Sequence, residues 1–202
     1  MRQFLYASIA LLLSPLSALA QEFPAHYAVT GVADDDVLNI RQGPSASDQI
    51  IGELGPYAFN IEVLETTSDG RWGKVPMPEG IGWVAMRFME PVGQDDPFTI
   101  PRPMTCVGTE PFWSLGLYPR GDEYSAMETG RRDLTLLTER VAENGYFAQF
   151  EEGPTLNRTL IIRKEQCGDG MSDREFGFSA FLFNDAPDGS DVQRGCCTLD
   201  SR

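Results

Sequence analysis

Short runs of alternating apolar and polar residues, separated by turns rich in Gly and Pro, constrain this chain more than any other feature. In residues 38–41 (Leu-Asn-Ile-Arg) apolar and polar side chains alternate, as a half-buried β-strand requires. Gly43-Pro44 ends this run, because proline cannot donate to a β-ladder and glycine adopts backbone angles that other residues avoid. Gly82-Trp83-Val84 indicates a further strand whose glycine lets the backbone pass close to a neighbour. The first half is therefore predicted to be a small all-β domain.

The same pattern continues in the second half of the chain. Residues 159–163 and 176–183 are rich in β-branched and aromatic side chains, and turn-forming residues separate the runs. About seven strands at this spacing predict a small β-barrel or β-sandwich. Residues 86–90 allow at most one short helical turn, and a helix of three turns is not expected. The predicted fold class is all-β, with two domains in tandem.

The N-terminus has the pattern of a secretory signal. Arg2 provides a basic start, residues 5–13 are apolar, and Ala18-Leu19-Ala20 has the small-x-small pattern of a cleavage site. The apolar run is too short to anchor the chain in a bilayer. Residues 1–20 are therefore expected to be removed on export, most simply to a bacterial periplasm, leaving a chain with no membrane span.

The remaining chain divides into two domains and a connection. Residues 27–92 hold the first domain, and residues 104–200 hold the second. Between them, residues 93–103 contain three prolines and show no periodicity, which predicts a semi-stiff linker. Residues 21–26, which include His26, are expected to form a short mobile lead.

The charge balance limits the partners. The sequence has 30 acidic and 16 basic residues, so its formal net charge is −14. Nucleic acid and anionic lipid repel such a chain, and neither is expected as a partner. The acidity is explained either by solubility after export or by attraction of a cationic partner.

Four cysteines lie in the second half, at Cys106, Cys167, Cys196 and Cys197. In an oxidising compartment they are expected to form disulfides. Because adjacent cysteines rarely pair with each other, Cys196 and Cys197 should each bond to one of the other two, in an order that the sequence leaves open. Zinc binding by four thiolates is the alternative, but the vicinal pair lacks the usual spacing of zinc ligands. No cofactor or metal is expected.

Four blocks in the first half carry a family resemblance. They are residues 39–44 (Asn-Ile-Arg-Gln-Gly-Pro), residues 51–54 (Ile-Gly-Glu-Leu), residues 70–75 (Gly-Arg-Trp-Gly-Lys-Val) and Gly82-Trp83-Val84. In order and spacing, residues 27–92 resemble the bacterial SH3-like (SH3b) domain family. The resemblance implies a five-stranded barrel and a role in targeting proteins to peptidoglycan or in joining proteins together.

Three residues are candidates for ligand binding in this domain. Trp83 and Tyr57 offer aromatic faces for an extended peptide, and Arg41 offers a cation for a carboxylate. Arg41 also has a structural interpretation, since an arginine is often simply solvated, and the neighbouring Trp72 is expected to pack in the barrel wall. We expect the ligand to be peptidoglycan, an extended peptide or another envelope protein.

The second half resembles a different family, one of small exported bacterial domains without an assigned activity. The resemblance rests on Cys106-Val-Gly-Thr-Glu-Pro-Phe-Trp113, on Cys167-Gly-Asp-Gly-Met-Ser-Asp173 and on Gly195-Cys196-Cys197. It implies export, disulfides and a β-rich fold, but no reaction.

The residues of the second half allow one enzymatic hypothesis. Glu110 precedes Pro-Phe-Trp, and apolar surroundings would raise the pKa of its carboxyl toward use as a general acid, with Asp169 or Asp173 as a partner in a glycosidase-like pair. The alternative is that Asp169 and Asp173 serve the turn around Gly170. Calcium binding by Asp169 and Asp173 is a weaker hypothesis, because the acidic spacing of calcium loops is missing, and the acidic loop of residues 185–191 is expected to be solvated.

The chain contains one histidine, His26, which lies outside the second domain in sequence. This argues against Ser-His and Cys-His hydrolases and against histidine-based zinc amidases. Cys196-Cys197 is also not the C-x-x-C motif of a thiol oxidoreductase. The sequence therefore favours a non-enzymatic binding or adaptor protein of the cell envelope, with a wall glycosidase using Glu110 or a secreted inhibitor of a lytic enzyme as alternatives.

Overall fold

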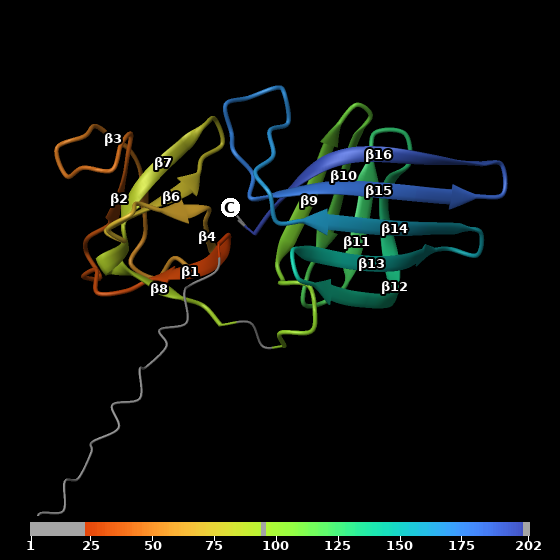
Figure 1. Cartoon of the computed structure of the whole chain (residues 1–202), viewed down its shortest axis with the longest axis horizontal. Helices are drawn as coiled ribbons and strands as arrows, with labels where there is room; N and C mark the ends of the chain where they lie inside the picture. The colour runs from red at the N-terminus through yellow and green to blue at the C-terminus, as the bar shows by residue number, and fades with distance from the viewer. Residues whose placement is uncertain (1–22, 94–95, 200–202) are drawn as a thin grey trace, which may run out of the picture.

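The computed structural model describes residues 23–93 and 96–199, and nearly every regular element there is a β-strand (Figure 1). The exception is a single 3-10 turn, η1 (Met86–Phe88), which agrees with the short turn predicted there. The all-β class is therefore confirmed. The predicted signal, residues 1–20, lies outside the described residues. Within those residues, no helix is long and apolar enough to cross a membrane.

The N-terminal domain consists of two small sheets that share one core. One sheet has the strand order β4-β1-β8, and the other has the order β3-β2-β7-β6-β5. Apolar side chains of both sheets meet between them, including Ile61 and Val63 from the first sheet and Ile40, Val75 and Val84 from the second. The strands are β1 (Ala25–Val29), β2 (Leu38–Arg41), β3 (Ile50–Leu54), β4 (Ile61–Val63), β5 (Glu65–Thr66), β6 (Trp72–Pro76), β7 (Ile81–Ala85) and β8 (Met89–Pro91).

The run that predicts β2 behaves as its alternation requires. Leu38 and Ile40 are buried in the domain core, whereas the side chains between and after them face outward. Gly82 of β7 lies against Ile40, and a Cβ atom at position 82 would come within 2.3 Å of Ile40 Cγ2. The predicted close approach of the backbone at Gly82 is thus confirmed.

The C-terminal domain is a closed barrel of eight antiparallel strands. Each strand pairs with the next along the chain, and the last strand returns to pair with the first. The sequence predicts about seven strands arranged as either a barrel or a sandwich. The structure shows a barrel with eight strands. The strands are β9 (Met104–Thr109), β10 (Phe112–Leu117), β11 (Asp122–Ala126), β12 (Gly130–Ala142), β13 (Gly145–Glu152), β14 (Leu156–Arg163), β15 (Phe178–Ala186) and β16 (Gly189–Thr198).

A disulfide lies across the seam at which the barrel closes. Cys197 of β16 is paired in register with Cys106 of β9, and the two side chains form a disulfide in the barrel core. The side chain of Cys196 points to the other face of β16, because successive residues of a strand alternate between its faces. There it forms the second disulfide, with Cys167. The expectation that each vicinal cysteine bonds to a distant one is confirmed, and the structure identifies the partners.

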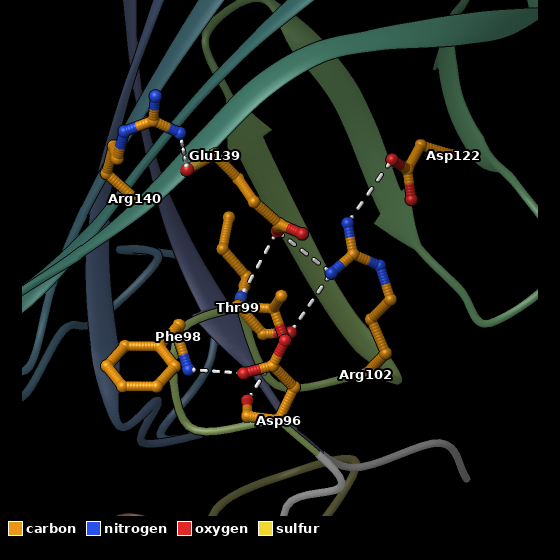
Figure 2. Close-up of polar contacts among 8 residues, drawn as sticks. Asp96, Phe98, Thr99, Arg102, Asp122, Glu139 and Arg140 are labelled. Carbon is orange, nitrogen blue, oxygen red and sulfur yellow. Dashed lines mark hydrogen bonds and ion pairs between the residues drawn. The ribbon is translucent and has the colours of Figure 1, made fainter.

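The segment that leads into the barrel packs against it (Figure 2). Ile100 is buried in the barrel core, and its backbone N–H donates to Glu139 Oε2 at 3.1 Å. Arg102 is paired with the same carboxylate at 3.0 Å and with Asp122 at 3.5 Å. Burial raises the pKa of the Asp122 carboxyl, although Arg102 counteracts part of this shift. The later part of the predicted linker is thus attached to the barrel by a half-buried arginine.

His26 was predicted to lie in a short mobile lead, and this prediction is wrong. It lies in β1, it is 9% exposed, and it pairs in register with Glu62 of β4. His26 is ordered and buried because of tertiary contacts: both His26 and Glu62 contact the end of the last barrel strand. His26 Nε2 is 2.7 Å from the carbonyl oxygen of Leu199, and the Thr198 hydroxyl donates to Glu62 Oε2 at 2.5 Å. The end of β16 therefore contacts the N-terminal domain directly.

The two disulfides should contribute unequally to stability. The Cys106–Cys197 bond joins residues 91 apart and the Cys167–Cys196 bond joins residues 29 apart. In the chain-entropy model these loops correspond to about 4.6 and about 3.6 kcal/mol. We expect the double variant Cys106→Ala/Cys197→Ala to lose more free energy of unfolding than Cys167→Ala/Cys196→Ala, as measured by denaturant titration. Equal losses would contradict an origin in loop length.

Candidate functional site

The candidate binding residues of the N-terminal domain lie in one row across its five-stranded sheet. Arg41 of β2 is paired with Trp83 of β7, and Trp83 is paired with Lys74 of β6. The row continues to Ile50 of β3 on one side and to Glu65 of β5 on the other. We call these five residues the Trp83 row. They face outward, because the neighbouring residues on β2, β6 and β7 are buried.

Trp83 lies between two cations. Its side chain is half-buried, and Lys74 Nζ is 5.6 Å from the centre of its ring system, within the range of a cation–π contact. Arg41 stands on the other side of Trp83 and donates one hydrogen bond, from Nη1 to the carbonyl oxygen of Asp48 at 2.8 Å. Because a guanidinium has five N–H donors, this bond leaves most of the donors of Arg41 available to a ligand.

Ile50 belongs to the row but is not among the binding residues predicted from the sequence. Its side chain is 51% exposed beside Arg41, so it adds apolar surface to the open end of the row. A β-bulge between Ile40 and Arg41 shifts the register of β2 and β3 at this point. The signal in the sequence is the pair Ile50-Ile51, in which two successive apolar residues break the alternation of a half-buried strand.

Tyr57 lies apart from the row, on the connection between β3 and β4. It is 71% exposed, and its hydroxyl donates to the carboxylate of Asp34. This hydrogen bond is the main reason why the pKa of the Tyr57 phenol is raised. Arg41 and Trp83 are thus brought together, whereas Tyr57 makes its contact with another loop. A binding role for the three residues remains a prediction.

The other end of the row is held by the C-terminal domain. Lys74 Nζ is 2.6 Å from Glu65 Oε1 and 3.2 Å from Glu175 Oε2, and Glu175 belongs to the segment between β14 and β15. That segment lies between the two domains (Figure 1). Burial alone would lower the pKa of Lys74, but the two carboxylates outweigh this effect and raise it. The second domain therefore helps to position a side chain of the row.

The carboxylates of the enzymatic hypothesis lie in a different part of the molecule. Glu110 is exposed in the turn between β9 and β10, and Phe112 beside it is itself 52% exposed. Phe112 therefore does not form the apolar enclosure around Glu110 that the enzymatic hypothesis requires. Asp169 serves its own turn: hydrogen bonds from the backbone N–H groups of Met171 and Ser172 lower the pKa of its carboxyl.

The acidic groups considered for metal binding are also spread out. Within residues 23–93 and 96–199, no three His, Cys, Asp or Glu side chains are grouped so that they could hold a metal ion. The expected acidic loop of residues 185–191 is instead the tip of the β15–β16 hairpin, with Asp185 in β15 and Asp191 in β16. There Asp185 accepts a hydrogen bond from the Ser190 hydroxyl, and Asp191 accepts one from Gln193.

Comparison with known proteins identifies the first domain. Residues 36–90 match the family model of the bacterial SH3 domain. The matched residues contain the whole Trp83 row and both small sheets except β1 and the end of β8. No curated protein and no solved structure matches the chain. The N-terminal half thus contains an SH3-like domain, matched to the bacterial SH3 family over residues 36–90, and the barrel lies outside the matched residues.

The contact between Lys74 and Glu175 predicts a measurable pKa change. Glu175→Gln should lower the pKa of Lys74, because it removes one of two charges that favour the ammonium form. The ion-pair stabilisation is complete below the unfolded-state pKa of lysine and is lost as the pH rises through the higher folded-state pKa. NMR titration of the Lys74 side chain measures the pKa, and denaturant titration at several pH values measures the stabilisation. Glu53→Gln, at an exposed glutamate of β3, is the control, and equal midpoints in the two variants would contradict the contact.

Proposed function

We propose that this chain is a non-enzymatic binding protein of the bacterial cell envelope, and that its SH3 domain recognises peptidoglycan or an extended peptide through the Trp83 row. A bacterial SH3 domain is a binding module that is often associated with the cell wall, and this family match is the starting point. The observation that carries the proposal is the register that places Arg41 and Lys74 on either side of Trp83.

The chemistry of the row suits a peptide that contains both a carboxylate and apolar groups. Trp83 and Ile50 supply apolar contact area, and Arg41 supplies N–H donors that match a carboxylate. Lys74 is already paired with two glutamates, so it supports the tryptophan face more than it offers a free charge. The stem peptides of peptidoglycan carry free carboxylates and small apolar side chains, and thus provide both kinds of group.

Location in the envelope is supported by three features. Both disulfides suit an oxidising compartment, residues 1–20 have the pattern of a secretory signal, and the SH3 match is to a bacterial family. The net charge of −14 disfavours nucleic acid and anionic lipid as partners. The proposed partners are therefore the wall itself or an envelope protein.

Sedimentation with purified peptidoglycan tests the proposed function. We expect the purified protein to pellet with the wall, and Trp83→Ala and Arg41→Gln each to weaken binding by roughly tenfold, as removal of a central contact does at many interfaces. Phe98→Ala is the matched control, because Phe98 is an aromatic residue that is 78% exposed outside the SH3 domain.

Two outcomes would count against this function. Failure of the wild-type protein to sediment with the wall would remove peptidoglycan as the ligand. Release of muropeptides by the wild-type protein, lost in Glu110→Gln, would show that the chain is an enzyme.

A further inference from the structure

A second candidate site lies on the barrel, where it faces the SH3 domain. It is a groove of about 830 Å³ whose floor is the outer surface of β9, β10 and β11. One wall is the segment of residues 169–176, and Pro78 and Glu79, at the tip of the β6–β7 hairpin, stand at its SH3 side. We call it the interdomain groove. Its volume falls within the range of small-ligand sites, and it contains none of the residues of the Trp83 row.

The floor of the interdomain groove presents hydroxyl groups. Ser114 of β10 is paired in register with Ser125 of β11, and Thr105 lies on the outer face of β9. All three side chains are half-buried, and their hydroxyls make no hydrogen bond within the described part of the chain. A hydroxyl donates one hydrogen bond and accepts two. The floor therefore offers a ligand three hydroxyl groups on neighbouring strands that are available for hydrogen bonding.

Apolar side chains form the rim of the groove. Phe112 is 52% exposed, Met171 is 66% exposed and Met127 is 85% exposed, and all three line it. Tyr118 folds over Gly116, where a Cβ atom would meet the ring at 2.3 Å. Exposed large apolar side chains grouped around a cavity are typical of a binding site.

Arg174 provides a cation with an unused donor in the wall. Its guanidinium carbon is 4.9 Å from the centre of the Phe176 ring, and its Nε atom is buried with no hydrogen-bond partner among the described residues. A buried donor without a partner is costly and is normally satisfied by a ligand or by water. Asp169 in the same wall differs, because its carboxylate accepts the hydrogen bonds of its own turn.

The wall that carries Arg174 is held in place from both ends. Cys167 is bonded to Cys196 of the barrel, and its backbone forms two hydrogen bonds with Phe176, each of 2.9 Å. The segment between these residues is therefore a loop closed by covalent and backbone bonds. A wall that is ordered before binding reduces the entropy that a ligand must overcome.

Charge and topology limit the ligand. The charged side chains that line the groove are Glu79, Asp169 and Arg174, and the whole chain carries −14, so an anionic ligand is disfavoured. The barrel is closed, so its backbone groups are paired around the ring and a peptide cannot be added as a further strand. A sugar chain meets these conditions, because it is rich in hydroxyl groups, has apolar ring faces and carries no charge.

We propose that the interdomain groove binds an uncharged oligosaccharide, with sugar rings against the apolar rim, sugar hydroxyls on the Ser and Thr floor, and an acceptor oxygen such as an acetamido carbonyl on Arg174. The site is separate from the Trp83 row and does not depend on the function proposed for that row. It would make the protein a binder of two ligands, one on each domain.

Calorimetric titration of the purified full-length protein with the hexamer of N-acetylglucosamine tests this site. We expect binding, and we expect Arg174→Met and Phe112→Ala each to weaken it by about tenfold. Arg163→Met, at an exposed arginine of β14, and Trp83→Ala should bind as the wild type does. If Arg174→Met fails to fold, as judged by thermal unfolding, Phe112→Ala carries the test, because Phe112 is already half exposed.

Three results would overturn the proposal. The first is no binding of the hexamer by the wild type. The second is binding that neither Arg174→Met nor Phe112→Ala changes. The third is tighter binding of a galacturonic acid hexamer, or of an acidic peptide rich in Phe, than of the uncharged sugar. Because Trp83→Ala serves as a control here, failure at the groove leaves the function of the SH3 domain untouched.

Discussion

The pairing of β16 with β9 is the contact on which the rest of the molecule depends. It closes the barrel, and it joins residues about ninety positions apart, so its formation carries a large loop-closure cost. The alternation of a strand places Cys197 inside and Cys196 outside, so the two disulfides brace both faces of this seam. A stable barrel then provides the surface against which the SH3 domain is packed.

The outer disulfide connects the barrel to both surfaces discussed for binding. It holds one end of the segment that carries Arg174 into the interdomain groove and Glu175 onto Lys74. Arg174 and Glu175 are adjacent in sequence, but Arg174 lines the groove on the barrel whereas Glu175 contacts Lys74 of the SH3 domain. The geometry beside Trp83 and the wall of the groove thus have a common support.

Local features were predictable from the sequence, and long-range contacts were not. The alternation in β2 and the close approach at Gly82 follow from strand periodicity and turn chemistry, which depend on near neighbours. The pairing of Arg41 with Trp83 did not follow, because it joins strands that are far apart in the chain. The placement of His26 in β1 did not follow, because its strand is formed by pairing with β4 and β8, far along the chain. Lys74 and Glu175 are likewise 101 residues apart, and nothing local to either residue indicates the other.

The contact between Glu62 and Thr198 has a consequence for the order of assembly during translation. Glu62 is fully buried, and Thr198, which donates to its carboxylate, is synthesised 136 residues after it. An N-terminal domain generally folds first on the ribosome, so a nascent SH3 domain carries this carboxylate in water until the barrel arrives. Docking of the barrel therefore removes this carboxylate from water, and the hydrogen bond from Thr198 replaces part of its hydration.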